Sequence, residues 1–170
     1  MREKFIFLIK REIKNAEEGK KAEIIAKMNS LVDPEIINLL YLASDSGVKI
    51  SLIVRGICCL YPQRKNLSEN IKVKSIIGHF LEHSRIFWFC NNGDNEVFIG
   101  SADWMRRNLD RRIEAVTPIE DYELKSTIYS LLQTYIKDDY FSWIMKEDGS
   151  YAKHSLDSAN NRSQIDLIEQ

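Results

Sequence analysis

A strand, a helix and a second strand in succession limit the fold of this chain more than any other feature. Residues 22–28 and 48–54 are two short, mainly apolar runs, and Asp33-Pro34 between them begins a helix that Gly47 ends. The second run is almost continuously apolar, as in a parallel strand that is covered on both faces. We therefore expect a right-handed crossover joining two parallel strands, and an α/β fold.

Further elements are predicted on both sides of this unit. Apolar residues at helical spacing predict an amphipathic helix over residues 3–18, which Gly19 ends. Asp121 begins a last long helix. The expected inward stripe of that helix is Leu124, Ile128, Leu131, Leu132 and Tyr135. Strands are expected at residues 71–77, 86–90, 97–99 and 113–116, and the polar tail is expected to be mobile or to form a short helix at residues 164–168.

The composition favours one domain whose binding properties depend on local clusters of charge. The chain has 170 residues, of which 44% are hydrophobic, and this is enough for one domain with a core. Its formal net charge is −1, so no field of the whole molecule attracts a polyanion, and we expect no nucleic-acid partner.

The cysteines and the apolar runs indicate a cellular compartment. Three cysteines form no C-x-x-C pair and leave an odd count, which argues against a zinc ribbon and against a disulfide framework. The apolar runs are shorter than the ~20 residues that cross a bilayer, and the first residues do not resemble a signal peptide. We expect a cytoplasmic protein without a membrane span.

Two polar clusters flank an expected hairpin of aromatic character. His83 and Arg85 stand at the entrance of one strand, and Gly100-Ser101-Ala102-Asp103 stands at the exit of its partner, across the turn Asn91-Asn92-Gly93-Asp94. Antiparallel pairing brings that exit beside that entrance. An imidazole titrates near neutral pH and can exchange a proton with a phosphoryl leaving group, and a guanidinium can neutralise the charge on the phosphoryl oxygens.

Arginines at two further places are candidate phosphate ligands. Arg55 and Gly56 directly follow an apolar strand, at the position where ligands of parallel sheets bind. On the residues alone, Arg55 is either a phosphate ligand or a member of a structural ion pair. Residues 104–112 hold four arginines and no lysine, which favours bidentate binding of phosphate oxygens. Ion pairs with Asp110 and Glu114 are the alternative.

The hairpin resembles the phospholipase D type of phosphoryl-transfer site, whose pattern is H-x-K, four residues, D, then G-S-x-N on the next strand. This chain departs from the pattern at Arg85, Cys90 and Asp103, which stand for the Lys, the Asp and the Asn. A phospholipase D-type phosphodiesterase combines two such motifs, one of which supplies a histidine nucleophile. This chain has one degenerate copy, so this alternative needs a second copy from elsewhere.

Residues 79–83 also spell H-x-x-E-H, the zinc motif of inverted metalloproteases. That chemistry needs His79 and His83 on one face of a sustained helix, with Glu82 as the base. Gly78 precedes the motif and a β-favouring aromatic run follows almost at once, so we expect too little helix for a zinc metalloprotease.

Four motifs in register resemble the C-terminal domain of bacterial polyphosphate kinase, the histidine-phosphorylating class. They are IIAKMNSLVD at residues 24–33, LIVRGICCL at 52–60, FLEHSRI at 80–86, and SADWM with RNLDRR between 101 and 112. The resemblance covers nearly the whole chain. It implies a phospholipase D-like α/β domain over residues 1–145, a mixed sheet with helices packed on its faces, followed by a polar C-terminal extension over residues 146–170.

The same resemblance implies an activity and a set of site residues. The activity is reversible transfer of the terminal phosphate of ATP to polyphosphate, through a phosphohistidine in a domain absent from this chain. His83 is the implied catalytic residue. The implied ligands of ATP or phosphate are Arg55, His83, Arg85, Ser101, Arg107 and Arg111. No metal ligands are expected here, because those for Mg²⁺ are expected outside this chain.

The implied partners are ATP or ADP, inorganic polyphosphate and the remaining domains of a parent enzyme, which is expected to be a homo-oligomer. The chain by itself is then expected to be inactive. A non-catalytic domain that binds polyanions or nucleotides is the remaining alternative.

Overall fold

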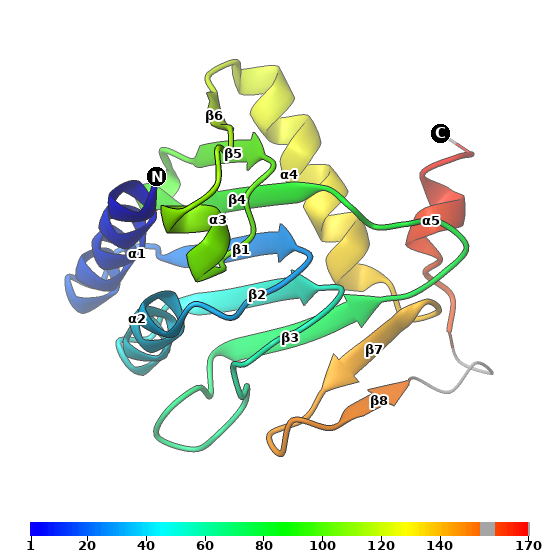
Figure 1. The fold of residues 1–170 in the computed structure, drawn as a ribbon, viewed down its shortest axis with the longest axis horizontal. Coiled ribbons are helices and arrows are strands. Elements are labelled where there is room, and N and C mark those ends of the chain that lie inside the picture. Colours follow the sequence, from blue (N-terminus) through cyan, green and yellow to red (C-terminus); the bar gives the residue numbers. More distant parts are fainter. Residues whose placement is uncertain (154–158, 170) are drawn as a thin grey trace.

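A mixed sheet forms the centre of the computed structural model, which describes residues 1–153 and 159–169. Within that part of the chain the sheet has eight strands in the order β6-β5-β4-β1-β2-β3-β7-β8 (Figure 1). The strands are β1 (Glu23–Met28), β2 (Lys49–Val54), β3 (Ile71–Ile76), β4 (Arg85–Phe89), β5 (Glu96–Gly100), β6 (Val116–Ile119), β7 (Ser142–Met145) and β8 (Tyr151–Lys153).

Helices cover both faces of the sheet (Figure 1). Helices α1 (Arg2–Glu17) and α2 (Pro34–Asp45) pack against each other on one face, and α4 (Tyr122–Lys137) lies on the other. The shorter helices are η1 (Asn91–Gly93), α3 (Arg106–Asp110) and α5 (Ser163–Asp166). The expected mixed sheet with helices on its faces is therefore confirmed. Among the described residues, no helix has the length and apolar character needed to cross a bilayer.

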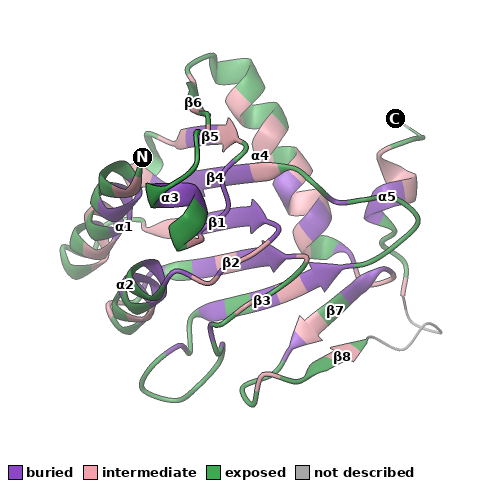
Figure 2. Cartoon of the chain, viewed as in Figure 1, coloured by how far each residue is buried: buried purple, intermediate pink, exposed green. Residues whose placement is uncertain are grey.

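The side chains of β1 alternate between two cores, as the period of a strand requires. Ile24, Ala26 and Met28 belong to the core beneath α1 and α2, whereas Ile25 belongs to the core beneath α4 together with Leu132. Figure 2 shows the central strands buried and the outer surfaces of the helices exposed. Because both of its faces are covered, the central part of the sheet is apolar throughout.

The crossover from β1 to β2 forms as the sequence predicts. The Asp33 side chain accepts a hydrogen bond from the Ile36 N–H at 3.1 Å, and Pro34 is the first residue of α2. Gly47 follows the helix with a φ of 92°, a left-handed conformation that glycine adopts without strain. Strands β1 and β2 then pair in parallel.

The predicted hairpin also forms, and its turn lies at the expected residues. Strands β4 and β5 pair antiparallel, with Arg85 beside Gly100. Between the strands, Asn91, Asn92 and Gly93 have φ values of 44°, 55° and 101°. Three successive left-handed residues therefore make the reversal.

The strand expected at residues 113–116 is displaced along the chain to β6. Ile113 is fully exposed, and residues 113–115 form a loop in which Glu114 accepts a hydrogen bond from the Ser101 hydroxyl. Strand β6 lies at the edge of the sheet, where Pro118 is tolerated although it lacks an N–H to donate.

The expected inward stripe of α4 is correct near the end of the helix and wrong at its start. Leu132 and Tyr135 are buried, and Ile128 and Leu131 are half-buried. Leu124 is 54% exposed. The first turn of α4 lies beside the edge strand β6, where little of the sheet remains to cover it (Figure 1).

Strands β7 and β8 are not indicated by the apolar pattern of the sequence. Strand β7 pairs with β3, and β8, which lies within residues 146–170, pairs with β7. Because β8 has no buried residue, it lacks the apolar run that marks a strand. Helix α5 lies close to the expected terminal helix, and residues 154–158 are outside the described residues. The division of the chain at residue 146 stays a prediction.

Candidate functional site

Four segments of the chain meet at one end of the sheet, on the right in Figure 1. The parallel strands β1 and β2 both end there, and β4 begins and β5 ends there, because β4 runs antiparallel to both of its neighbours. The residues at these strand ends form one row: Arg55, Asn29, Arg85 and Ser101.

Asp103 connects the members of this row. Its Oδ1 accepts a hydrogen bond from the Asn29 N–H at 2.7 Å, and its two oxygens each lie 3.3 Å from a nitrogen of the Arg85 guanidinium. The Arg85 and Asp103 side chains are only 13% and 8% exposed, so water screens this ion pair poorly. The exit of β5 therefore meets the entrance of β4, as the sequence predicts.

Arg55 joins these residues from the end of β2. We call the four residues Asp103, Asn29, Arg85 and Arg55 the Asp103 network. Its Nε donates a hydrogen bond to the Asn29 Oδ1 at 3.0 Å. A side chain at Gly56 would place its Cβ 2.9 Å from the Asn29 carbonyl oxygen, so glycine permits this close approach. Within the described ranges Arg55 has no acidic partner, and its terminal nitrogens make no hydrogen bond. The ion pair that was the alternative for Arg55 is not formed there.

His83 lies in residues 77–84, which connect β3 to β4. Its backbone oxygen accepts a hydrogen bond from Arg85 Nη1 at 2.8 Å, so His83 is linked through Arg85 to Asp103. The residue is exposed, and the described residues provide no hydrogen-bond partner for its imidazole. The ring is therefore available to a ligand at this end of the sheet.

A buried ion pair lies beneath this loop. Lys27, which is 1% exposed, places Nζ 3.0 Å from the Glu82 carboxylate, 2.7 Å from the Ser84 hydroxyl and 4.8 Å from the centre of the Tyr135 ring. Burial lowers the pKa of the Lys27 ammonium, and the attraction of Glu82 opposes this effect. Burial, together with Glu82, raises the pKa of Tyr135. Lys27 thus joins β1 to Glu82 and Ser84, the residues on both sides of His83.

Ser101 stands in the row, but its hydroxyl is engaged elsewhere. It donates a hydrogen bond to Glu114 and accepts one from the Ala115 N–H at 3.1 Å. Hydrogen bonds from Ser101 and Asn108 lower the pKa of the Glu114 carboxyl. Ser101 thus supports the loop beside the site, and its hydroxyl makes no hydrogen bond with Arg85.

The four arginines of residues 104–112 divide into two paired and two unpaired side chains. Arg106 lies 4.0 Å from Asp110, and Arg112 lies 3.5 Å from Glu114. Arg107 and Arg111 are exposed and form no ion pair with any described residue. Neither is joined to the Asp103 network by a hydrogen bond in that part of the chain.

The helix required by the H-x-x-E-H motif is not formed. Residues 78–84 are irregular, so His79 and His83 do not share a helix face. Glu82 is buried and bound by Lys27, which leaves it unsuited to act as the base of a metalloprotease. This geometry contradicts the zinc-protease alternative.

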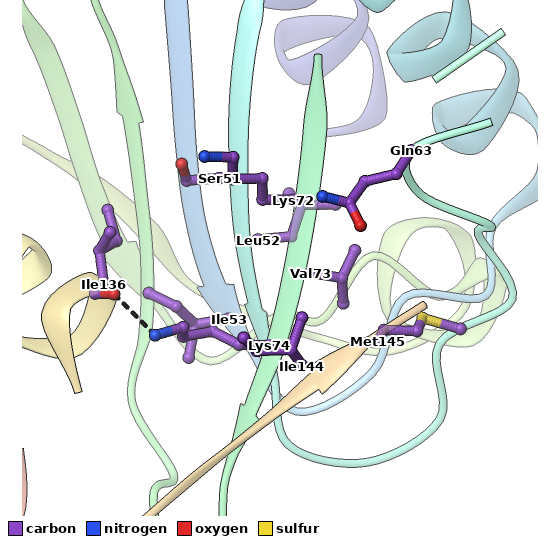
Figure 3. Close-up of a pocket in the computed structure, with 10 residues that line it drawn as sticks. All are labelled: Ser51, Leu52, Ile53, Gln63, Lys72, Val73, Lys74, Ile136, Ile144 and Met145. Carbon is purple, nitrogen blue, oxygen red and sulfur yellow. Dashed lines mark hydrogen bonds between the residues drawn. The ribbon is translucent and has the colours of Figure 1, made fainter. Parts of the chain in front are cut away.

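A hollow of about 290 Å³ lies elsewhere, where β2, β3 and β7 meet the end of α4 (Figure 3). Its lining is mainly apolar, and none of its lining residues belongs to the Asp103 network. Lys74 in its wall is engaged, because its Nζ donates hydrogen bonds to the backbone oxygens of Ile136 at 2.7 Å and Asp138 at 2.6 Å. The hollow is therefore separate from the site at the strand ends.

Sequence reasoning identified the arginines of the site but missed what joins them. Asn29 bridges Arg55 and Asp103, and Lys27 holds the loop from below. The position of Asn29, directly after a strand and level with Arg55, is the signal that marks it. Lys27 gives no such signal, because a lysine inside an apolar run reveals its partner only when the fold is known.

The arrangement is suited to binding an oxyanion. Lys27, Arg55 and Arg85 face two carboxylates, Glu82 and Asp103, so one cation is in excess. The two terminal nitrogens of Arg55 make no hydrogen bond with a described residue, so they can bind phosphate oxygens in pairs.

The sheet, its covering helices and the cations at the strand ends define a protein with the phospholipase D-like fold. Two solved structures share this fold at 15% identity. NucT from Helicobacter pylori covers 81% of this chain with a TM-score of 0.57. The phospholipase D family member Nuc from Salmonella typhimurium covers 83% with a TM-score of 0.51. A family model identifies the family within this fold. The model "Polyphosphate kinase C-terminal domain 2" matches residues 1–164. The chain therefore belongs to the polyphosphate kinase family.

Individual relatives support the same assignment. The polyphosphate kinase of Parasynechococcus marenigrum is 56% identical over 165 residues, which are 96% of this chain and 23% of that protein. The polyphosphate kinase of Pseudomonas syringae is 48% identical over 165 residues, 95% of this chain and 22% of that protein. The crystal structure of polyphosphate kinase from Porphyromonas gingivalis matches 99% of this chain and 26% of its own, with a TM-score of 0.94 and 42% identity. This chain spans about a quarter of the length of these relatives.

Proposed function

We propose that this chain is the C-terminal part of a polyphosphate kinase, and that it supplies nucleotide- and phosphate-binding residues to the active site of that enzyme. The enzyme transfers the terminal phosphate of ATP reversibly to polyphosphate, through a phosphohistidine carried by another domain. The family assignment and the cations at the strand ends support this proposal.

One observation carries the proposal: two guanidiniums and an exposed imidazole are held at one end of the sheet by the Asp103 network. Phosphoryl transfer requires mainly positioning and the neutralisation of charge, which these groups can provide. Arg55 and His83 hold the phosphates of ATP or ADP, and His83 assists the leaving group. Arg85 and Ser101 support that position, and the unpaired Arg107 and Arg111 line the path of the polyphosphate.

The carboxylates beside the site do not fit a Mg²⁺ ion. Asp103 is engaged by Arg85, and Glu82 is engaged by Lys27, so neither has a free carboxylate for a metal. We propose that the Mg²⁺ ligands of the reaction lie outside this chain. The enzyme is proposed to work in the cytoplasm as a homo-oligomer.

Replacement of His83 tests the proposal in the full-length enzyme that contains this chain. We expect His83→Ala to reduce polyphosphate synthesis from ATP by at least about 100-fold, the usual scale for loss of a proton-transfer group. His79→Ala is the matched control, because His79 is also exposed in the same loop, and its ring packs against Phe141 and makes no hydrogen bond to Asp103, Arg85, Arg55 or Asn29. Unchanged synthesis in His83→Ala, with a normal circular dichroism spectrum, would contradict the site.

Incubation of the 170-residue chain with ATP labelled at the γ-phosphate tests the position of the phosphohistidine. We expect no stable label on this chain, because the phosphorylated histidine lies in another domain. A phosphohistidine on this chain would show that the shared site is wrong.

Binding without catalysis is a second candidate function for the chain in isolation. The exposed side chains of Arg107 and Arg111 favour it, because they need no other domain to attract a polyanion. Titration calorimetry of the chain with inorganic polyphosphate measures this directly.

A further inference from the structure

The loop that carries His83 has little of its own to hold it in place. Residues 78–84 are irregular, and their apolar side chains do not pack inward, since Phe80 and Leu81 are 57% and 67% exposed. A segment without a backbone ladder or a buried apolar anchor is expected to move. Its conformation must therefore come from contacts with other parts of the chain.

Gln164 on α5 makes the most complete of these contacts. Its Nε2 donates a hydrogen bond to the Phe80 backbone oxygen at 2.8 Å, and its Oε1 accepts one from the Phe80 N–H at 3.0 Å. The same Nε2 also donates to the Glu82 carboxylate at 2.8 Å. Gln164 is 4% exposed, so its amide binds the loop in the way that a neighbouring strand would.

Gly78 makes room for this contact. A Cβ at that position would lie 2.8 Å from Cδ1 of Phe141 and would overlap the amide of Gln164. Any side chain at Gly78 therefore displaces either the amide or the backbone of the loop.

Helix α5 is itself fixed to the body of the domain. Asp138, which is fully buried, accepts hydrogen bonds from the Ser163 N–H at 2.8 Å and from the Ser163 hydroxyl at 2.5 Å. The other Asp138 oxygen accepts from the Phe141 N–H at 2.8 Å. A helix of four residues does not form without such contacts, so Gln164 is presented by a fixed support.

The contacts leave His83 facing outward. Glu82 is bound by Gln164 and Lys27, and the Ser84 hydroxyl is bound by Lys27. The side chains on both sides of His83 are bound by Lys27, whereas the His83 side chain is exposed at the end of the sheet.

We propose that Gln164 is a positioning residue of the phosphotransfer site, which fixes the backbone of residues 78–84 and thereby the imidazole of His83. The inference deepens the proposed function and rests on it. Nothing in the sequence motifs points to Gln164, which lies 84 residues from Phe80 along the chain.

Hydrogen exchange of the full-length enzyme tests the structural part of this inference. Gln164→Met keeps the length of the side chain but removes all three hydrogen bonds. Within residues 78–84 we expect the amide of Phe80, which donates to Gln164, to exchange at least about tenfold faster. Gln133→Met is the matched control, because Gln133 is half-buried on α4 and its side chain makes no hydrogen bond with a described residue. Unchanged exchange in residues 78–84 would overturn the inference, whether or not the enzyme is active.

Kinetics test the functional part. We expect Gln164→Met to lower kcat for polyphosphate synthesis by about tenfold, because small misplacement of a catalytic group is costly. If Gln164 acts through His83, the same change in a His83→Ala background lowers the residual rate by less than about twofold. An equal loss in both backgrounds would indicate a purely structural role and would overturn the inference.

A second variant serves if Gln164→Met does not fold. Gly78→Ala leaves Gln164 in the chain but displaces its amide, and we expect the same faster exchange and the same dependence on His83. If His83→Ala itself leaves synthesis unchanged, the proposed function fails. If His83→Ala is inactive but neither Gln164→Met nor Gly78→Ala alters kcat, only this inference fails.

Discussion

The carboxylate of Asp103 accepts a hydrogen bond at 2.7 Å from the backbone N–H of Asn29, which lies 74 residues earlier in the chain. The same oxygen lies 3.3 Å from Nε of Arg85. One acidic side chain therefore fixes a strand end and an arginine together. The resembling phospholipase D pattern has asparagine at this position, which also accepts a hydrogen bond but carries no charge.

The charge of Asp103 is testable apart from its shape. Asp103→Asn keeps an oxygen for the Asn29 N–H but removes the partner of the largely buried Arg85, so we expect a loss of about 1–3 kcal/mol in the free energy of unfolding. Urea denaturation of the 170-residue chain measures it. The control is Asp94→Asn in the exposed turn after β4. Equal stability of the two variants would show that the charge of Asp103 is not needed.

Arg55 is expected to need its guanidinium and not only its charge. Arg55→Lys keeps the cation but loses the flat pair of donors and the hydrogen bond to Asn29, so we expect ATP to bind the full-length enzyme about tenfold more weakly. The measurement is the KM for ATP, with Arg64→Lys as the control outside the site. A KM within about twofold of the unaltered enzyme would argue against phosphate binding by Arg55.

The Lys27–Glu82 pair is expected to show strong coupling. Lys27→Met leaves the Glu82 carboxylate buried without its cation, which typically costs about 3–5 kcal/mol of folding stability. Lys27→Met combined with Glu82→Gln removes both charges and keeps an oxygen for Gln164, so we expect part of the loss to be recovered. Urea denaturation of the two single variants and the double variant measures the coupling. Additive losses would mean that the two charges do not interact.

Acid should weaken the start of α2 through Asp33. Burial alone would raise the pKa of Asp33, but hydrogen bonds from Arg2 and from the Ile36 N–H hold it below its ordinary value of 3.8. The stability that Asp33 contributes is therefore present above that ordinary value, and it is lost as the pH falls through it toward the lower pKa of the folded state.

Asp33→Asn isolates this effect, because asparagine is also a good helix N-cap. We expect the variant to be less stable than the unaltered chain at neutral pH, and the difference to shrink below a pH of about 4. Thermal unfolding across that range measures the difference. Asp45→Asn, at an exposed position on the same helix, is the control. A difference that does not depend on pH would exclude the Arg2–Asp33 ion pair as its source.

The sequence predicted the fold best where the structure of a short segment is determined by its own residues. The Asp33 cap, the Pro34 start and the Gly47 stop are local signals, and they predicted the β1–α2–β2 unit. The meeting of Arg85 with Asp103 was also predictable, because hairpin pairing follows from two neighbouring strands.

Contacts between distant parts of the chain were not predictable in this way. The burial of Lys27 with Glu82, and the hold of Gln164 on Phe80, join residues that share no local pattern. Strand β8 was missed because it pairs at the rim of the sheet with no buried residue to mark it.

The contacts on both sides of His83 constrain the number of residues between Glu82 and strand β4. Glu82 and Ser84 face Lys27, while His83 faces away, and strand β4 fixes the count from Arg85 onward. Removing Ser84 would put His83 directly before Arg85, in the place of the hydroxyl that now binds Lys27, and would bring an imidazole beside a buried ammonium group. Natural variation in the length of this connection should therefore spare the step from Glu82 to Arg85.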